Sequence, residues 1–259
     1  MTPFRDAWRR NPLLAGGAAA SFLLFLLLTP AVTLDPTTIL GINRWIKPMK
    51  FAISIAIFLA TMGWLLGYLR DSARAVRRIS RVMVVLMMGE LALITLQSAR
   101  GVRSHFNNET LFDGLVFSAM GIMIALNTVA AGWALYLFLR RPADLGRASL
   151  AGVRLGLVLF IVASLQGFHM AGRLGHGVGI HDGSPGLPFV NWSTGGGDLR
   201  VAHFFGLHAL QVLPLLGFWM DRRGVRPGWL GVAAAVYFVV YALVLVQALA
   251  GRPLLAGLR

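Results

Sequence analysis

The stretch WLGVAAAVYFVVYALVLVQALA, residues 229–250, contains no charged side chain over its whole length. An α-helix rises 1.5 Å per residue, so about 20 apolar residues cross the ~30 Å hydrocarbon core of a bilayer. A stretch of this length and composition therefore predicts a transmembrane helix. It makes the fold of the rest of the chain a question of membrane topology.

The whole chain has the composition of a membrane protein. Its 259 residues are 57% hydrophobic and 13% charged, whereas soluble domains average about 45–50% and about 25%. We predict an all-α membrane protein, a single domain across residues 1–259 built as a bundle of seven transmembrane helices. The first apolar run exceeds the ~7–15 residues of a signal peptide, so we expect an uncleaved signal anchor. The predicted spans are about 12–33, 48–69, 82–101, 113–139, 153–172, 199–220 and 229–250.

The distribution of basic residues predicts the orientation. The chain carries 24 Lys and Arg against 10 Asp and Glu, a formal net charge of +14. Every loop on the side of the N-terminus is rich in arginine, so we expect the N-terminus in the cytoplasm and the C-terminus outside, in a bacterial inner membrane. The positive charge of these loops then lies at the cytoplasmic surface of the membrane. We therefore predict contact with membrane lipid rather than with nucleic acid. The inner basic residues are Arg5, Arg9, Arg10, Arg70, Arg74, Arg77, Arg78, Arg81, Arg140, Arg141, Arg147, Arg154, Arg222, Arg223 and Arg226.

The absence of cysteine restricts the chemistry. It excludes disulfides, iron–sulfur clusters, thiolate metal sites and covalent haem attachment, so any metal must be held by His, Asp or Glu. All six histidines fall in the outer half of the predicted topology. His176 and His181 belong to a long outer loop, residues 173–198, rich in Gly and Pro, where we expect solvent exposure and a lid or binding role. The candidate metal ligands are the other four: His105, His169, His203 and His208.

Polar residues share a face on four of the predicted helices, because a helix advances 100° per residue. Facing lipid, such residues would cost several kcal/mol each, so we expect them to line a polar cavity open to the outside and floored by Glu90, His208 and Gln211. The sets are Lys47, Lys50, Ser54 and Thr61; Glu90, Gln97 and Ser104; Gln166, His169 and Arg173; and Arg200, His203, His208 and Gln211, with Asp198 placed to cap the helix N-terminus.

The third and fourth helices faintly resemble the fifth and sixth. Each pair has a Leu-Gln near the outer end of its first helix, at Gln97 and Gln166, and an Asp that opens the second, at Asp113 and Asp198. Both hairpins run in the same direction, which argues against an inverted-repeat transporter. We expect the glutamines to form hydrogen bonds between helices.

The stretches RWIKPMKFAIS (44–54), LQSARGVRSHFN (96–107) and GDLRVAHFFGLHALQVLP (197–214) resemble those of bacterial polytopic membrane proteins with W-x-K-P-x-K-F and H-F-x-G-L-H motifs. This resemblance covers most of the chain and implies no activity. The histidine-rich outer side is similar to that of the seven-helix metal-dependent hydrolases of the alkaline ceramidase group. Their histidine pair is four residues apart on the last helix, whereas His203 and His208 lie five apart on the sixth. Microbial rhodopsins are excluded, since residues 229–250 lack the lysine that binds retinal.

Three classes of function fit these residues. The first is redox chemistry or electron transfer with haem b or a divalent metal (Zn or Fe), whose ligands would be drawn from the four histidines. Cationic side chains would pair with haem propionates, and the amides would complete the cofactor site: Lys50, Arg100, Arg173 and Arg200, with Gln97, Gln166 and Gln211.

The second class is a metal-dependent hydrolase or transferase acting on a lipid or a periplasmic anion. Three ligands would hold the metal and leave a position for water, with Glu90 or Asp198 as general base. The third class is a proton-coupled transporter or sensor that uses Glu90 and His208 as a relay near the membrane midplane. The sequence leaves the substrate and the oligomeric state open.

Overall fold

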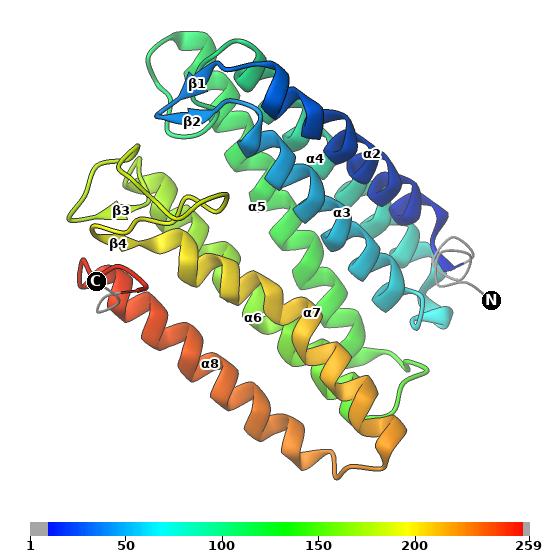
Figure 1. Cartoon of the computed structure of the whole chain (residues 1–259). Helices are drawn as coiled ribbons and strands as arrows, with labels where there is room; N and C mark the ends of the chain where they lie inside the picture. Colours follow the sequence, from blue (N-terminus) through cyan, green and yellow to red (C-terminus); the bar gives the residue numbers. More distant parts are fainter. Residues whose placement is uncertain (1–9, 256–259) are drawn as a thin grey trace. The chain divides into compact units, whose positions relative to one another are not determined.

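The computed structural model describes residues 10–255 (Figure 1). Within that range seven helices are long and apolar enough to cross a membrane, which confirms the predicted all-α class. The orientation of the termini stays a prediction. The helices are α2 (Pro12–Leu34), α3 (Ile46–Leu66), α4 (Ala73–Ala99), α5 (Leu111–Arg140), α6 (Arg147–Gly172), α7 (Leu199–Arg223) and α8 (Gly228–Leu249), with a 3-10 turn, η1 (Arg70–Ser72), before α4.

Two helices begin well before the apolar segments that predicted them. Helix α4 starts at Ala73 rather than near residue 82, and α6 starts at Arg147 rather than near residue 153. The added turns are rich in Arg and Ala, which are strong helix formers. Hydropathy located the segment of each helix that can enter the hydrocarbon core, whereas both helices begin before that segment.

Short strand pairs occur in two connections, a feature that the sequence did not predict. Strand β1 (Thr38–Ile39) pairs with β2 (Ile42–Asn43), and β3 (Gly177–Val178) pairs with β4 (Gly197–Asp198), both antiparallel. Two residues per strand are too few to show the alternation that marks a strand.

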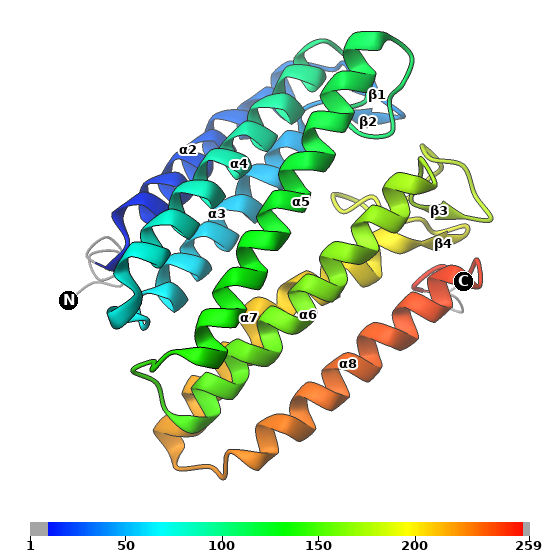
Figure 2. The same ribbon diagram turned by 180° about the vertical axis from the view of Figure 1, so that it is seen from behind.

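The chain consists of two compact units, one ending at Asp144 and the other beginning at Leu145, and each is described by itself. In unit 1, α2, α3, α4 and α5 run alternately up and down and lie side by side (Figures 1 and 2). Asn11 caps α2 by accepting a hydrogen bond from the Leu14 amide, and it donates another to Ser80 Oγ of α4 at 2.7 Å.

Asp35 holds the connection between α2 and α3. Its Oδ2 accepts hydrogen bonds from Arg44 Nε at 2.6 Å and from Trp45 Nε1 at 2.8 Å, and Arg44 also reaches the Ala99 carbonyl at the end of α4. Hydrogen bonds from Thr37, and to a smaller extent those from Trp45 and Arg44, hold the pKa of Asp35 well below its ordinary value. The contacts fix the loop that leads to Lys47.

Unit 2 is built on the close pairing of α6 with α7, against which α8 packs (Figure 2). A Cβ on Gly152 would lie 2.4 Å from the Leu213 carbonyl oxygen, and one on Gly217 would lie 2.5 Å from that of Ala148. Glycines at these positions let the two backbones touch, as in many membrane helix pairs. At the same end Asp221 of α7 accepts hydrogen bonds from the Ser149 amide at 2.8 Å and from Ser149 Oγ.

Large apolar side chains lie on the surface of both units. On α8, Val236, Leu243 and Val246 are 60%, 63% and 62% exposed. An apolar surface of this kind suits contact with lipid chains, and the chain therefore has the character of a multi-pass membrane protein.

Candidate functional site

The candidate site in unit 1 is centred on Glu90, near the middle of α4. The side chain of Glu90 is 1% exposed, and its Oε2 has no hydrogen-bond partner among the described residues. A carboxyl group buried in this way needs either a cation or a proton to neutralise it. Glu90 is therefore a candidate for binding a proton or a cation.

His105 is the polar neighbour of Glu90. Its Nε2 lies 3.8 Å from Glu90 Oε1, and its Nδ1 lies 3.1 Å from Ser104 Oγ. Three phenylalanine rings surround the imidazole, with centroids at 5.6 Å for Phe51, 6.1 Å for Phe106 and 6.3 Å for Phe117. The imidazole thus joins the loop between α4 and α5 to a carboxyl group inside the helices.

The end of α4 sets the position of His105. Gly101 adopts φ +75°, and the amides of Gly101 and Val102 bond to the carbonyls of Ser98 and Gln97. This is a Schellman ending, which needs a left-handed residue after the helix. Ser104, predicted on the helical stripe of Glu90, therefore lies in the loop, where it is buried. Phe106 also has a positive φ, 57°, so the loop is tightly turned on both sides of His105.

The environment of His105 favours the neutral imidazole. Burial lowers the pKa of His105 well below its ordinary value, and the positive charge of Lys47 on α3 lowers it further. The positive charge of Lys47 also attracts the negative charge of the Glu90 carboxylate. A neutral imidazole has one donor and one acceptor nitrogen, so it can take a proton at one nitrogen while it releases one from the other.

Asp113 forms a different kind of cluster at the same end of unit 1. Its Oδ1 accepts hydrogen bonds from Gln97 Nε2 at 2.8 Å and from Arg100 at 2.5 Å, and its Oδ2 accepts one from Thr110 Oγ1 at 2.6 Å. Thr110 caps α5, since its hydroxyl accepts from the Asp113 amide. Gln97 and Arg100, predicted to bind a cofactor, thus join α4 to α5. The expected interhelical bond of Gln97 is confirmed.

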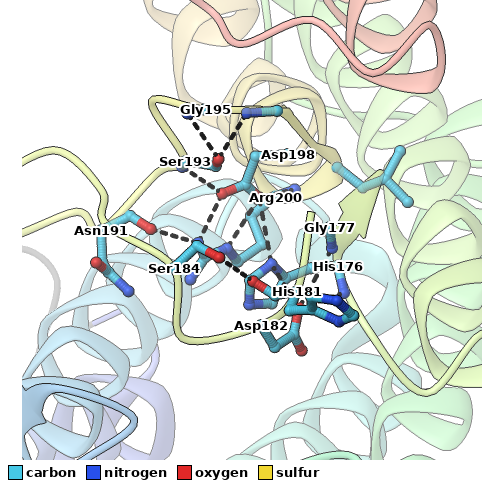
Figure 3. A network of polar contacts seen from close by, with 12 residues as sticks. His176, Gly177, His181, Asp182, Ser184, Asn191, Ser193, Gly195, Asp198 and Arg200 are labelled. Carbon is cyan, nitrogen blue, oxygen red and sulfur yellow. Dashed lines mark hydrogen bonds and ion pairs between the residues drawn. The ribbon is translucent and has the colours of Figure 1, made fainter. Parts of the chain in front are cut away.

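In unit 2 the polar groups gather at the start of α7 (Figure 3). Asp198 is 1% exposed and accepts hydrogen bonds from the Arg200 amide at 3.0 Å, from Arg200 Nε at 2.9 Å and from the Ser193 amide at 2.9 Å. Burial by itself would raise the pKa of Asp198, but the hydrogen bonds and charge of Arg200 outweigh burial and lower it. The predicted N-cap role of Asp198 is confirmed. Arg200 also reaches the Asn191 carbonyl.

His176 is a participant that the sequence reasoning missed. The expectation of solvent exposure is wrong for it, because its side chain is 18% exposed and its Nδ1 lies 3.3 Å from Asp182 Oδ1 and 3.7 Å from Asp198 Oδ1 (Figure 3). His181 is exposed as expected. The pairing of His176 depends on how the long loop folds back onto α7. The only sequence signal for this contact was the presence of acidic residues at positions 182 and 198.

The remaining histidines of unit 2 differ in their surroundings. His203 Nδ1 lies 2.8 Å from the Ala163 carbonyl of α6, and His208 Nδ1 lies 2.8 Å from the Phe204 carbonyl in its own helix. The ring of His208 also stacks on Phe204, with centroids 4.0 Å apart. His169 is exposed. If Nδ1 donates to a carbonyl, the lone pair is left on Nε2 of His203 and of His208.

The predicted ligand set is divided between the units. His105 belongs to unit 1, and the other three candidate ligands belong to unit 2, so their convergence stays a prediction. Within residues 10–255 no group of three or more His, Asp or Glu side chains is arranged to hold a metal ion. A haem needs only one or two histidine ligands. The absence of a three-residue metal-binding group among the described residues therefore does not test haem binding.

The other residues predicted to bind a cofactor have varied settings. Gln166 Nε2 donates to the Leu199 carbonyl at 2.9 Å, which confirms its expected interhelical bond. Arg173 lies exposed at the end of α6, whereas Lys50 and Gln211 are partly buried on α3 and α7. Their predicted cofactor contacts stay untested.

Comparisons of the chain with known protein families, with curated proteins and with solved structures found no match. The residues and their surroundings are therefore the basis of any functional conclusion.

Proposed function

We propose that this chain is a bacterial inner-membrane protein that binds and releases a proton at Glu90 through His105, as part of a transporter or a sensor. The observation that carries the proposal is a buried carboxyl group with an unpartnered oxygen and an imidazole 3.8 Å away inside an apolar helix unit. Intramembrane ionisable residues commonly mark proton and ion pathways.

The proton would pass from the loop side to Glu90 in one exchange. The neutral imidazole of His105 releases the proton on Nε2 to the Glu90 carboxylate, and it takes another at Nδ1, next to Ser104 Oγ. Hydrogen-bonded partners lie about 2.7–3.2 Å apart, so Nε2 and Oε1 must approach before transfer. The phenylalanine rings give the imidazole a largely apolar environment, and the positive charge of Lys47 offsets the negative charge of the Glu90 carboxylate.

This proposal changes the relay partner expected from the sequence. The sequence paired Glu90 with His208, which belongs to unit 2, whereas His105 lies beside Glu90 within unit 1. We keep the predicted orientation, with the N-terminus in the cytoplasm and the relay opening to the outside.

A proton-flux measurement tests the transport form of the proposal. The full chain is reconstituted in liposomes with a pH-sensitive dye inside, and an external pH step is applied. We expect Glu90→Gln to lose at least about a hundredfold in flux, the lower end of the usual contribution of an acid–base group. Glu109→Gln is the matched control, since Glu109 is an exposed carboxylate paired with Arg103 at the same end of unit 1. Equal fluxes for wild type and Glu90→Gln would contradict transport through this group.

A haem or metal ion is a second candidate. It is favoured by the bonds of His203 Nδ1 and His208 Nδ1 to backbone carbonyls, an arrangement that orients many ligating histidines. An absorption spectrum and metal analysis of one purified sample test it. A Soret band that disappears in His203→Ala or His208→Ala would support haem, and a colourless, metal-free protein would contradict this candidate.

A further inference from the structure

A recess with a volume of about 560 Å³ lies in unit 1 between the start of α4 and the end of α5. This volume is within the ~300–1,000 Å³ of most small-molecule sites. Both helices are of membrane-spanning length, so the recess lies where a helix end meets the lipid headgroups. It is lined by Asp71, Ser72, Ala73, Arg74, Ala75, Arg77, Leu137 and Arg141.

The charges around the recess favour an anion. Arg74, Arg77 and Arg141 line it against a single carboxylate, that of Asp71. Within residues 10–255 none of these three arginines forms an ion pair, whereas the neighbouring Arg70 is paired with Asp144 at 3.1 Å. Guanidinium groups bind phosphate with two parallel hydrogen bonds. Three such groups line one recess without an ion pair to any described residue, which favours binding of a phosphate.

The backbone at the start of α4 adds to this preference. The N-cap residue Ser72 makes no side-chain cap hydrogen bond, and the first turn of α4 contains no acidic residue. The first amides of a helix lack partners inside the helix and carry a partial positive charge. Ala73 and Ala75, which also line the recess, belong to this turn.

We propose that the recess binds the phosphate group of an anionic membrane lipid, with Arg74, Arg77 and Arg141 as its ligands. A lipid is favoured over a soluble phosphate because the recess lies at the ends of two helices that are long and apolar enough to cross a membrane. Further along α5, Tyr136 and Val129 lie two turns apart on one face and are 55% and 69% exposed, which offers an apolar surface to acyl chains. The headgroup would lie among the arginines and the acyl chains along α5, as in basic sites for anionic lipids between transmembrane helices.

Lipid retention measured by native mass spectrometry tests the proposal. The full chain is purified in detergent with phosphatidylglycerol, and the bound lipid is counted after release from the micelle. We expect the variant Arg74→Gln/Arg77→Gln/Arg141→Gln to retain phosphatidylglycerol at least about tenfold less strongly, because three charge-assisted contacts to the phosphate are lost. The matched control is Arg78→Gln/Arg81→Gln/Arg140→Gln, which removes three exposed arginines from the same two helices outside the recess. We expect the control to change retention by less than about twofold.

Two further arms decide the identity of the ligand. Phosphatidylcholine should be retained weakly by every variant, because its headgroup has no net charge. An equal loss in the control variant would overturn the proposal, since it would show general attraction to a basic surface. Displacement of phosphatidylglycerol by inorganic phosphate would also overturn it, because the site would then take a soluble anion. If the triple variant fails to fold, Arg141→Gln compared with its neighbour Arg140→Gln gives the same test.

Discussion

Asp198 and Glu90 are equally buried, each 1% exposed, yet their surroundings are opposite. Both oxygens of Asp198 accept hydrogen bonds from Arg200 or from backbone amides, whereas Oε2 of Glu90 has no partner in the described part of the chain and Oε1 faces an imidazole 3.8 Å away. A buried charge with all its bonds made stabilises one conformation, while a buried acid with bonds missing can exchange a proton. The first is structural, and the second is the candidate for function.

Isosteric amide substitutions at the two carboxyl groups should give the largest difference. We expect Asp198→Asn to lower the free energy of unfolding by about 3–5 kcal/mol, because it leaves the Arg200 guanidinium without its counter-charge in a partly buried site. Glu90→Gln should change it by less than about 1 kcal/mol, since no ion pair or hydrogen bond to Glu90 Oε2 is lost. Thermal unfolding followed by tryptophan fluorescence in detergent measures both. A larger loss for Glu90→Gln than for Asp198→Asn would reverse the comparison.

The two regions should also differ in the pH at which they lose stability. The pKa of His105 is lowered in the folded protein, so the unfolded chain binds a proton there first as the pH falls below about 6.5. The contribution of His105 to stability is therefore complete above that pH and decreases below it, by up to about 1.4 kcal/mol per pH unit, until the folded protein also takes the proton.

Asp198, whose pKa is lowered from 3.8, should lose its contribution only in stronger acid. Unfolding midpoints collected across the acidic range check both windows. His105→Gln should remove the decrease that begins near pH 6.5 and leave the one at lower pH. If the decrease near pH 6.5 persists in His105→Gln, another group causes it.

The smallest effects should come from the two glutamines that join hairpin helices. Gln97→Leu removes the bond to Asp113 and Gln166→Leu removes the bond to the Leu199 carbonyl, and each should cost about 0.6–1.7 kcal/mol. We expect Gln97→Leu to cost less, since Asp113 keeps Arg100 and Thr110, whereas the Leu199 carbonyl loses a side-chain donor. The same unfolding assay compares them. A larger loss of unfolding free energy for Gln97→Leu would contradict this ranking. It would show that Asp113 depends more on the Gln97 amide than on the Arg100 guanidinium.

Local rules predicted much of this molecule and failed where distant segments meet. Apolar length located every described helix, and a carboxylate before an apolar run correctly indicated the cap at Asp198. The spacing of Gln97 and Gln166 indicated interhelical hydrogen bonds. The sequence did not place His105 beside Glu90 or His176 between Asp182 and Asp198, because both contacts depend on loop conformations with left-handed residues such as Phe106 and Leu174. The recess at Arg141 brings together segments at least 60 residues apart, and hydropathy carries no information about it.

Infrared difference spectroscopy on the full chain in lipid, recorded between an alkaline and a mildly acidic pH, tests the central claim most directly. Among protein groups only a protonated carboxyl group gives the high-frequency carbonyl stretching band, and the ester band of the lipid cancels in the difference, so the remaining band reports proton binding at a buried acid. We expect the wild type to gain such a band on acidification, Asp198→Asn to keep it and Glu90→Gln to lose it. A band of equal size in Glu90→Gln would contradict the proposal that Glu90 binds the proton.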